Sequence, residues 1–450
     1  MTATTARPGP VTAVPLRRIY RFELTKLAAQ WRVRLLLLAG WVGPAAFVVG
    51  VSQQSSLPAD TLFGRWMHAS GWAGSLVVLG FAGTWALPLA VSLVAGDSFA
   101  AEDRLGTWRH LLVAVRSTRR IFAAKALASA TVILLLVLGL ACSSVVGGLL
   151  AVGSHPLAGL DGHVLAPADA ATRLVLAWGS IVAPTLALAA VGLLGSVTLS
   201  SSPVGLLLPA VVALAMQLAQ LLPLPVPVRL ALPGYGFIAW HGLFTDPAQL
   251  APLATSAVVS LAWAAILGTA AYVIFRARDF TNIHERGSGR RALTVGVLPL
   301  LVVSASTAAV VAWTAGASGS GIDKAKVERS VATSFGHLYR LQTEQLGRPP
   351  VTEAQLQTSA TCTKGGGLEP AQGPGNDWRC IVSWHLPGVD AVGTAVYQLD
   401  VSADGQLVAD GDGPKEVNGY FQVRSPNGTE PNPLWQFDAV VDLSSTTPKG

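Results

Sequence analysis

Long apolar stretches alternate with short polar segments along the first 316 residues of the chain. A helix needs about 20 apolar residues to cross the hydrocarbon core of a bilayer. Stretches near or above that length lie at Leu35–Val51, Trp72–Ala95, Ala126–Gly153, Arg173–Leu199, Val204–Leu222, Ala251–Phe275 and Ala292–Gly316. We therefore predict seven transmembrane helices.

The pattern changes after Gly316. The remaining residues are polar and Gly-rich and contain no stretch that could span a bilayer. Apolar residues at helical spacing between Val327 and Leu341 predict a helix. Alternation in Trp378–Leu386 and Thr394–Asp410 predicts antiparallel strands. The predicted fold class is an all-α polytopic membrane bundle followed by a small α+β domain.

Composition and the first residues agree with a membrane protein. Of the 450 residues, 51% are hydrophobic and 12% are charged. Residues 1–26 are too polar and Pro-rich for a signal peptide, so we expect the first span to be a retained anchor. Pro15–Arg34 has apolar positions at helical spacing among several arginines. This pattern predicts a basic amphipathic helix in the membrane interface, or else a simple flank of the first span.

The positions of Lys and Arg predict the orientation, because cytoplasmic loops carry an excess of both. With a cytoplasmic N-terminus, the inner segments 1–34, 96–125 and 276–291 contain seven, six and five of them. The outer loops contain Arg65, Arg173 and Arg229. Seven crossings of the cell (plasma) membrane then place the C-terminal domain outside.

This orientation divides the chain into four parts. They are the cytoplasmic N-terminus with its amphipathic helix (1–34), a six-span core (35–275), a basic inner loop with the seventh span (276–316) and an extracytoplasmic α+β domain (317–450). Cations exceed acids in the membrane part, 21 to ten, whereas the tail has ten cations and 15 acids. No basic face with interleaved aromatic residues is present, so we expect lipid rather than nucleic acid as the partner of the cations.

Cysteine usage gives an independent prediction for the C-terminal domain. Of the three cysteines, Cys142 lies within a span, and Cys362 and Cys380 lie in the domain, 18 residues apart. Such a pair in an oxidising compartment predicts a disulfide. Two free thiols or half of a zinc site are the alternatives. A disulfide agrees with the outside location that the charges predict.

Chemically reactive groups are scarce. No Asp, Glu or Lys lies in the interior of a predicted span between Leu35 and Phe275. Ion-coupled transporters and intramembrane proteases need such groups, so we expect neither class. His337 and His385 in the C-terminal domain lack a Ser or Cys nucleophile pattern, and we interpret both as solvent-facing. We predict no catalytic residue and no metal site.

The segment Pro223–Pro247, on the predicted outer side, is broken by Pro and Gly and rich in aromatic residues. Irregular backbone with interfacial aromatics is typical of a segment that dips into the outer leaflet and returns; a surface loop on the headgroups is the alternative. The candidate residues for an outer gate in this segment are Tyr235, Phe237, Trp240 and His241.

Asp97–Lys125, between the second and third predicted spans, is the longest strongly charged run in the first 275 residues. Ala101, Leu105, Trp108 and Leu112 repeat at helical spacing and predict one helix over Asp97–Val113 on the inner face. Leu105, Trp108 and Leu112 are expected to anchor it to the bundle and to leave a polar ridge exposed. The alternative is a charged loop that only fixes the topology.

Residues in and after this predicted helix resemble the permeases of type-2 ABC exporters. The similarity rests on an acid, a Gly-Thr pair, a Leu-Leu pair, a Ser/Arg turn, an aliphatic residue and a lysine. In this chain they are Glu102, Gly106, Thr107, Leu111, Leu112, Ser117, Arg119, Ile121 and Lys125. The resemblance covers roughly residues 15–280 and includes the order of the first six spans. Val115 and Thr118 depart from it, standing where a Pro and an Arg are usual.

The resemblance implies that a separate ATPase subunit docks on the inner helix, and that ATP-driven closure of two ATPases moves two permeases. The residues implied in ATPase coupling are Glu102, Asp103, Arg104, Gly106, Thr107 and Arg109. The chain has no G-x-x-x-x-G-K-[ST] phosphate-binding loop, so we expect ATP and Mg²⁺ on the partner, and neither cofactor nor enzymatic activity in this chain. The expected partners are an ABC ATPase, a second permease copy in a homodimer or heterodimer, and the lipid bilayer.

A seven-span membrane sensor with an extracellular ligand-binding domain is the alternative hypothesis. It predicts a ligand for the isolated C-terminal domain and no ATPase partner. The cargo of an exporter stays open, because Ala, Leu, Val, Gly and Ser line the interior of any helical membrane bundle.

Overall fold

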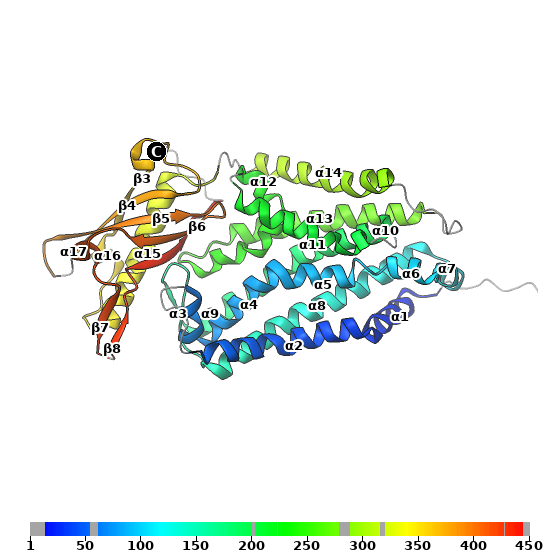
Figure 1. Ribbon diagram of the computed structural model, residues 1–450, viewed down its shortest axis with the longest axis horizontal. Helices are drawn as coiled ribbons and strands as arrows, with labels where there is room; N and C mark the ends of the chain where they lie inside the picture. Colours follow the sequence, from blue (N-terminus) through cyan, green and yellow to red (C-terminus); the bar gives the residue numbers. More distant parts are fainter. Residues whose placement is uncertain are drawn as a thin grey trace, which may run out of the picture.

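The computed structural model describes residues 14–54, 62–199, 203–222, 224–278, 289–315, 320–386, 388–426 and 428–443. In Figure 1, helices run side by side along the long axis of the molecule and a β-sheet domain lies at one end. The helices α1 (Leu16–Ala29), α6 (Ala100–Leu105) and α7 (Trp108–Val115) lie at the opposite end. We call these two ends the domain end and the α6–α7 end.

Five helical segments among the described residues are long and apolar enough to cross a membrane, and all five lie at predicted spans. They are α2 (Trp31–Ser52); α4 (Gly71–Phe81), η1 (Ala82–Ala86) and α5 (Leu87–Val94), which are continuous; α8 (Thr118–Ala151); α9 (Pro167–Ser180) with α10 (Val182–Thr198); and α13 (Ala251–Arg276). The other two predicted spans are helices α11 (Pro203–Leu221) and α14 (Gly289–Ala315), whose described apolar parts are shorter. Seven crossings therefore stay a prediction, and the helical bundle itself is confirmed.

The helix that contains the second predicted span widens at η1, a single π-helical turn. Pro88 has no N–H for the carbonyl oxygen of Thr84, and the N–H of Leu87 bonds five residues back to Ala82. Proline and π-turns commonly occur together because the wide turn absorbs the missing hydrogen bond. Gly83 in this turn lies against the ring of Phe237, one of the candidate gate residues.

The long helix α8 packs against α1, α2 and α4. Ser144 of α8 forms a buried hydrogen bond of 2.7 Å with Ser75 of α4, and Trp178 of α9 donates to the same Ser75 hydroxyl at 3.0 Å. The backbones also approach closely, because a Cβ atom on Gly148 would collide with the carbonyl oxygen of Gly71. Small residues and interhelical hydroxyl groups are the usual means of helix packing in membranes.

The C-terminal domain has the predicted α+β architecture. One helix, α15 (Lys324–Gln345), packs on a five-stranded antiparallel sheet of order β3-β4-β5-β6-β9. The strands are β3 (Ser359–Lys364), β4 (Gly375–His385), β5 (Val392–Val401), β6 (Gln406–Gly411) and β9 (Gln436–Val440). Val331 and Phe335 of α15 meet Tyr397 of β5 in a core separate from that of the bundle.

Smaller elements complete the fold. They are α3 (Leu62–Ala69), β1 (Leu157–Ala158), β2 (Val164–Leu165), α12 (Val226–Leu230), η2 (Pro233–Phe237), η3 (Ala239–Phe244), α16 (Glu353–Leu356), η4 (Gly365–Gly367), α17 (Lys415–Asn418), β7 (Gln422–Ser425) and β8 (Gly428–Pro431). The hairpin β1–β2 and the turns η2 and η3 lie where the bundle meets the C-terminal domain.

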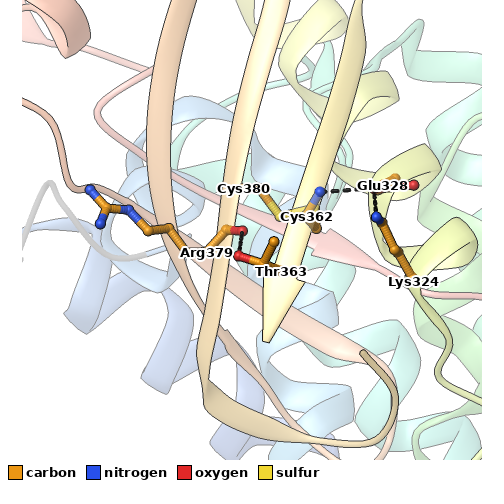
Figure 2. Close-up of a disulfide and its surroundings, with 6 residues drawn as sticks. All are labelled: Lys324, Glu328, Cys362, Thr363, Arg379 and Cys380. Atoms are coloured by element: carbon orange, nitrogen blue, oxygen red, sulfur yellow. Dashed lines mark hydrogen bonds and ion pairs between the residues drawn. A yellow bond between two sulfur atoms is a disulfide. The ribbon is translucent and has the colours of Figure 1, made fainter. Parts of the chain in front are cut away.

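The predicted disulfide is confirmed. Cys362 of β3 and Cys380 of β4 are direct cross-strand partners and are bonded to each other (Figure 2). The N–H of Cys362 donates to Glu328 of α15 at 2.8 Å, so this edge strand is tied to β4 on one side and to the helix on the other. Lys324 lies 3.7 Å from the same carboxylate.

A direct check of the disulfide is to count the free thiols. The unreduced, denatured chain is expected to take up one maleimide, at Cys142, and the reduced chain three, which mass spectrometry distinguishes. Cys142→Ser is the matched control and should take up none before reduction. Three labels without reduction, on chain from native membranes, would mean that the disulfide does not form there.

Candidate functional site

The charged segment 97–113 forms two helices rather than the single helix that its pattern predicts. The helix α6 ends at Gly106, whose φ of 65° is in the left-handed region, and α7 begins at Trp108. A glycine in this conformation ends a helix without the steric cost that a side chain would add. The expected continuous helix was therefore wrong, because Gly106 interrupts the apolar spacing on which it was based.

At the start of α6, the hydroxyl of Ser196 on α10 accepts hydrogen bonds from the N–H groups of Phe99 and Ala100, at 2.9 and 3.0 Å. These groups belong to the first turn of the helix, where no intrahelical partner exists. A buried side chain of another helix thus fixes the position of α6 relative to the bundle.

Glu102 is the centre of a buried charge network. Its side chain is 1% exposed and accepts hydrogen bonds from Lys26 of α1, Thr107 and Lys125 of α8, the last at 2.7 Å. The ammonium group of Lys125 also lies 3.0 Å from a carboxylate oxygen of Glu23 and 3.1 Å from the carbonyl oxygen of Ser98. Two acids and two lysines from three segments therefore neutralise one another; Glu23, Glu102 and Lys125 are buried, and Lys26 is partly exposed.

The pKa of Glu102 reflects this setting. Burial by itself would raise it, but the charge of Lys125 and the hydrogen bonds from Lys125, Lys26 and Thr107 lower the pKa to about 2. Glu102 is therefore a carboxylate at neutral pH, and it acts as a structural anion rather than as a proton donor. The aromatic rings of Phe99 and Trp108, each 5.8 Å from the Lys125 ammonium, cover the pair.

Two further acids of the segment are also paired within the chain. Asp97 forms ion pairs with Arg32 and Arg104, the latter at 2.6 Å. Asp103 accepts two hydrogen bonds from Arg278, just after α13, at 2.7 and 3.0 Å, and one from the Trp108 indole at 2.8 Å. Asp97, Glu102 and Asp103 thus hold the segment against other parts of the chain, and Glu102 and Asp103, which the resemblance implied in ATPase coupling, are engaged within the chain.

The predicted anchors of the segment behave differently from one another. Trp108 is buried as expected, and Leu112 is half-buried. Leu105 is 68% exposed, so the expectation that it contacts the bundle was wrong. The break at Gly106 separates α6 from α7, so Leu105 does not lie on the same face as Trp108. Arg104, Gly106 and Arg109 are exposed, and Thr107 is half-buried.

An apolar groove opens beside this exposed side, between α1 and the α6–α7 pair. Its volume is about 680 Å³. Ile19 and Phe22 of α1 form one wall, and Leu105, His110 and Leu111 form the other. Arg18 also lines it, as do Lys26 and Glu102, which are paired with each other. We call this feature the α1–α7 groove.

Residues missed by the sequence reasoning include Glu23 and Arg278. Glu23 is buried between Ile19 and Leu27, one helical turn away on either side, and an acid on the apolar side of a basic helix was a visible signal. Arg278 carries no comparable signal, since its partner Asp103 is 175 residues away in the chain.

The candidate gate residues lie at the other end of the bundle. Tyr235, Phe237 and Trp240 are buried, and His241 is half-buried. They belong to η2 and η3, and η2 packs against α10, α11 and α13. The carbonyl oxygen of Ala231, just before η2, accepts hydrogen bonds from Trp263 of α13 and Thr307 of α14, each at 3.1 Å. The segment is thus inserted among helices, and its place relative to a membrane stays a prediction.

The same segment holds the C-terminal domain. Buried Arg229 donates to the carbonyl oxygens of Leu224, at 3.0 Å, of Ser320, at 2.9 Å, and of Ala403 in the C-terminal domain. Burial lowers the pKa of this guanidinium, and the charge of Asp404 opposes that change. The His241 ring is hydrogen-bonded to Gln406, and burial lowers the pKa of His241 to about 4. From the sequence, Arg229 was counted only among the cations of the outer loops and was assigned no contact with the C-terminal domain.

A scan against protein-family models and a search of curated proteins found no match to this chain.

Neutralising one partner of the buried network should destabilise the protein. Glu102→Gln is expected to lower the free energy of unfolding by about 3–5 kcal/mol, because Lys26 and Lys125 lose their shared partner. The double variant Glu102→Gln/Lys125→Met should lose less than the sum of the two single variants. Since the folded-state pKa of Glu102 is about 2 and its ordinary value 4.5, the stabilisation is complete above that ordinary value and is lost as the pH falls toward 2.

Denaturant unfolding in detergent micelles measures these differences. Asp412→Asn is the matched control, since it removes the exposed ion pair of Asp412 with Arg379 and should cost less than about 1 kcal/mol. A Glu102→Gln variant as stable as this control would show that the network does not hold the α6–α7 end together.

Proposed function

We propose that this chain is the membrane-spanning subunit of an ATP-driven exporter of the type-2 ABC class. It forms the translocation path together with a second permease, and segment 97–113 couples it to a separate ATPase subunit that holds ATP and Mg²⁺. In this proposal the α6–α7 end is cytoplasmic, the chain crosses the cell membrane seven times, and the C-terminal domain is outside.

The observation that carries the proposal is the set of buried and partly buried ion pairs that attach α6 to other helices. A segment that transmits the movement of a partner needs an exposed surface for the partner and firm contacts with the rest of its own chain. Arg104, Leu105 and Arg109 provide the exposed surface. Behind it, Glu102 ties α6 to α1 and α8, and Asp103 ties it to the end of α13. A movement of α6 and α7 would therefore pass to α1 and to the two long helices α8 and α13.

The residues that carry the family resemblance take part in this attachment. Glu102, Thr107 and Lys125 form one hydrogen-bonded unit, and Gly106 provides the turn that brings Thr107 back to Glu102. Ser117 accepts a hydrogen bond from the N–H of Arg120 and so begins α8. These physical roles support reading the motif as a coupling element rather than as a chance similarity.

The α1–α7 groove supports the proposal from the partner's side. A helix or loop of an ATPase that fills it would need apolar residues for Phe22 and Leu105, and an acid for Arg18, because Lys26 is already paired with Glu102. Charge complementarity of this kind orients two proteins and speeds their association. At the domain end, Tyr235, Phe237 and Trp240 are buried and, in this proposal, form the outer gate.

An exposed residue of the groove gives a test that leaves the fold intact. Leu105→Glu is expected to reduce the ATPase that co-purifies with the full chain from its native membranes by at least about tenfold, or about 1.4 kcal/mol. The bound subunit is identified by mass spectrometry through its phosphate-binding loop, and its amount is measured by ATP hydrolysis. Leu368→Glu is the matched control, because Leu368 is 93% exposed in the C-terminal domain.

Equal amounts of the ATPase subunit with both variants would contradict docking at the groove. The absence of any ATPase with the wild-type chain, together with a ligand that protects the C-terminal domain from proteolysis, would favour the membrane sensor instead.

A further inference from the structure

A cluster of two histidines and an aspartate lies where the C-terminal domain meets the bundle. His163 comes from the β1–β2 hairpin, Asp246 from the loop after η3, and His337 from α15 of the C-terminal domain. One potential ligand atom from each lies within 4.8 Å of the other two. The rings of His163 and His337 are 5.4 Å apart, and Nδ1 of His163 is 3.7 Å from Oδ2 of Asp246.

His337 is buried, which corrects its interpretation as a solvent-facing residue; His385 is exposed as expected. Nδ1 of His337 faces Asp161, 3.2 Å from the carbonyl oxygen and 3.4 Å from Oδ2. Asp161 is itself fixed by the N–H groups of His163 and Asp246, at 3.1 and 2.7 Å. This contact orients the ring and leaves Nε2 of His337 available, with Oε1 of Glu353 at 3.6 Å from it.

We propose that His163, Asp246 and His337 bind a divalent transition-metal ion of the Zn²⁺ class. Two imidazoles and one carboxylate are a ligand set that suits zinc, with a fourth position left for water or a further carboxylate. Asp161 takes the part of an outer carboxylate that orients a histidine ligand. A tetrahedral ion with bonds of about 2.0–2.1 Å needs ligand atoms about 3.3 Å apart, so side-chain shifts of about 1 Å close the site.

The surroundings provide access to the site. The side chains of His163 and Asp246 are 28% and 47% exposed. A cavity of about 490 Å³ borders the cluster and is lined by both His163 and His337. An ion can therefore reach the ligands without opening the core of the C-terminal domain.

The position of the three ligands gives the ion its effect. His163 and Asp246 belong to loops of the helical bundle, whereas His337 belongs to the C-terminal domain. A bound ion therefore joins the two parts, in addition to the contacts that Arg229 and His241 make between them. The metal makes the attachment of the C-terminal domain depend on the ion concentration around it.

Cobalt titration of the full chain in detergent tests this site. The chain, purified with a tag that lacks histidine and stripped with a chelator, is expected to bind one Co²⁺ with the visible absorption of a tetrahedral site, and Zn²⁺ should displace it. His163→Ala and Asp246→Asn should abolish this spectrum. Asp161→Asn should weaken the affinity by about 10–100-fold, because it alters the carboxylate that orients His337.

His385→Ala is the matched control and should bind cobalt as the wild-type chain does. The elution volume of each variant reports whether it is folded, and Asp246→Asn changes a half-exposed side chain that can be replaced without disturbing the core. The absence of a zinc-displaceable cobalt spectrum in the wild-type chain would overturn the proposal. Equal cobalt affinity in His163→Ala, Asp246→Asn and the wild-type chain would overturn it as well, leaving His337 and Asp161 as a simple ion pair.

Discussion

The buried ion pair between Glu102 and Lys125 is the interaction on which the α6–α7 end depends. Neither charge can stay alone in an apolar bundle, so each needs partners with matching geometry. Glu23 and Lys26 of α1 supply them, which fixes α1 and α6 against α8 in one arrangement. These ion pairs fix the positions of α6 and α7, and with them the exposed surface of the two helices and the α1–α7 groove.

The domain end is held by a different kind of contact. There, Arg229 donates hydrogen bonds to backbone carbonyl groups from both sides of the boundary, and the charge of Asp404 favours its charged form. His163, Asp246 and His337 converge at the same boundary. The two ends of the bundle thus use buried charges differently. Salt bridges join helices at the α6–α7 end, whereas Arg229 joins the C-terminal domain to the bundle at the domain end.

Patterns along the sequence predicted those features of the structure that residues close together in the chain determine. The positions of the long helices follow from apolar length, and the bond between Cys362 and Cys380 was predicted from their spacing and from the predicted outside location of the domain. The burial of Glu102 could not be predicted in this way, since Lys125 and Lys26 are 23 and 76 residues away. The exposure of Leu105 depends on the break at Gly106. A prediction from helical spacing assumes one continuous helix and therefore misses this break.

The most direct test of this account is a distance measurement across the α1–α7 groove. Spin labels at Phe22→Cys and Arg109→Cys, in a Cys142→Ser background, report the distance between α1 and α7 by pulsed electron resonance. We predict a narrow distribution in the otherwise unchanged chain and a broad one when Glu102→Gln is added. Equally narrow distributions in both would contradict the claim that the buried pair positions these helices.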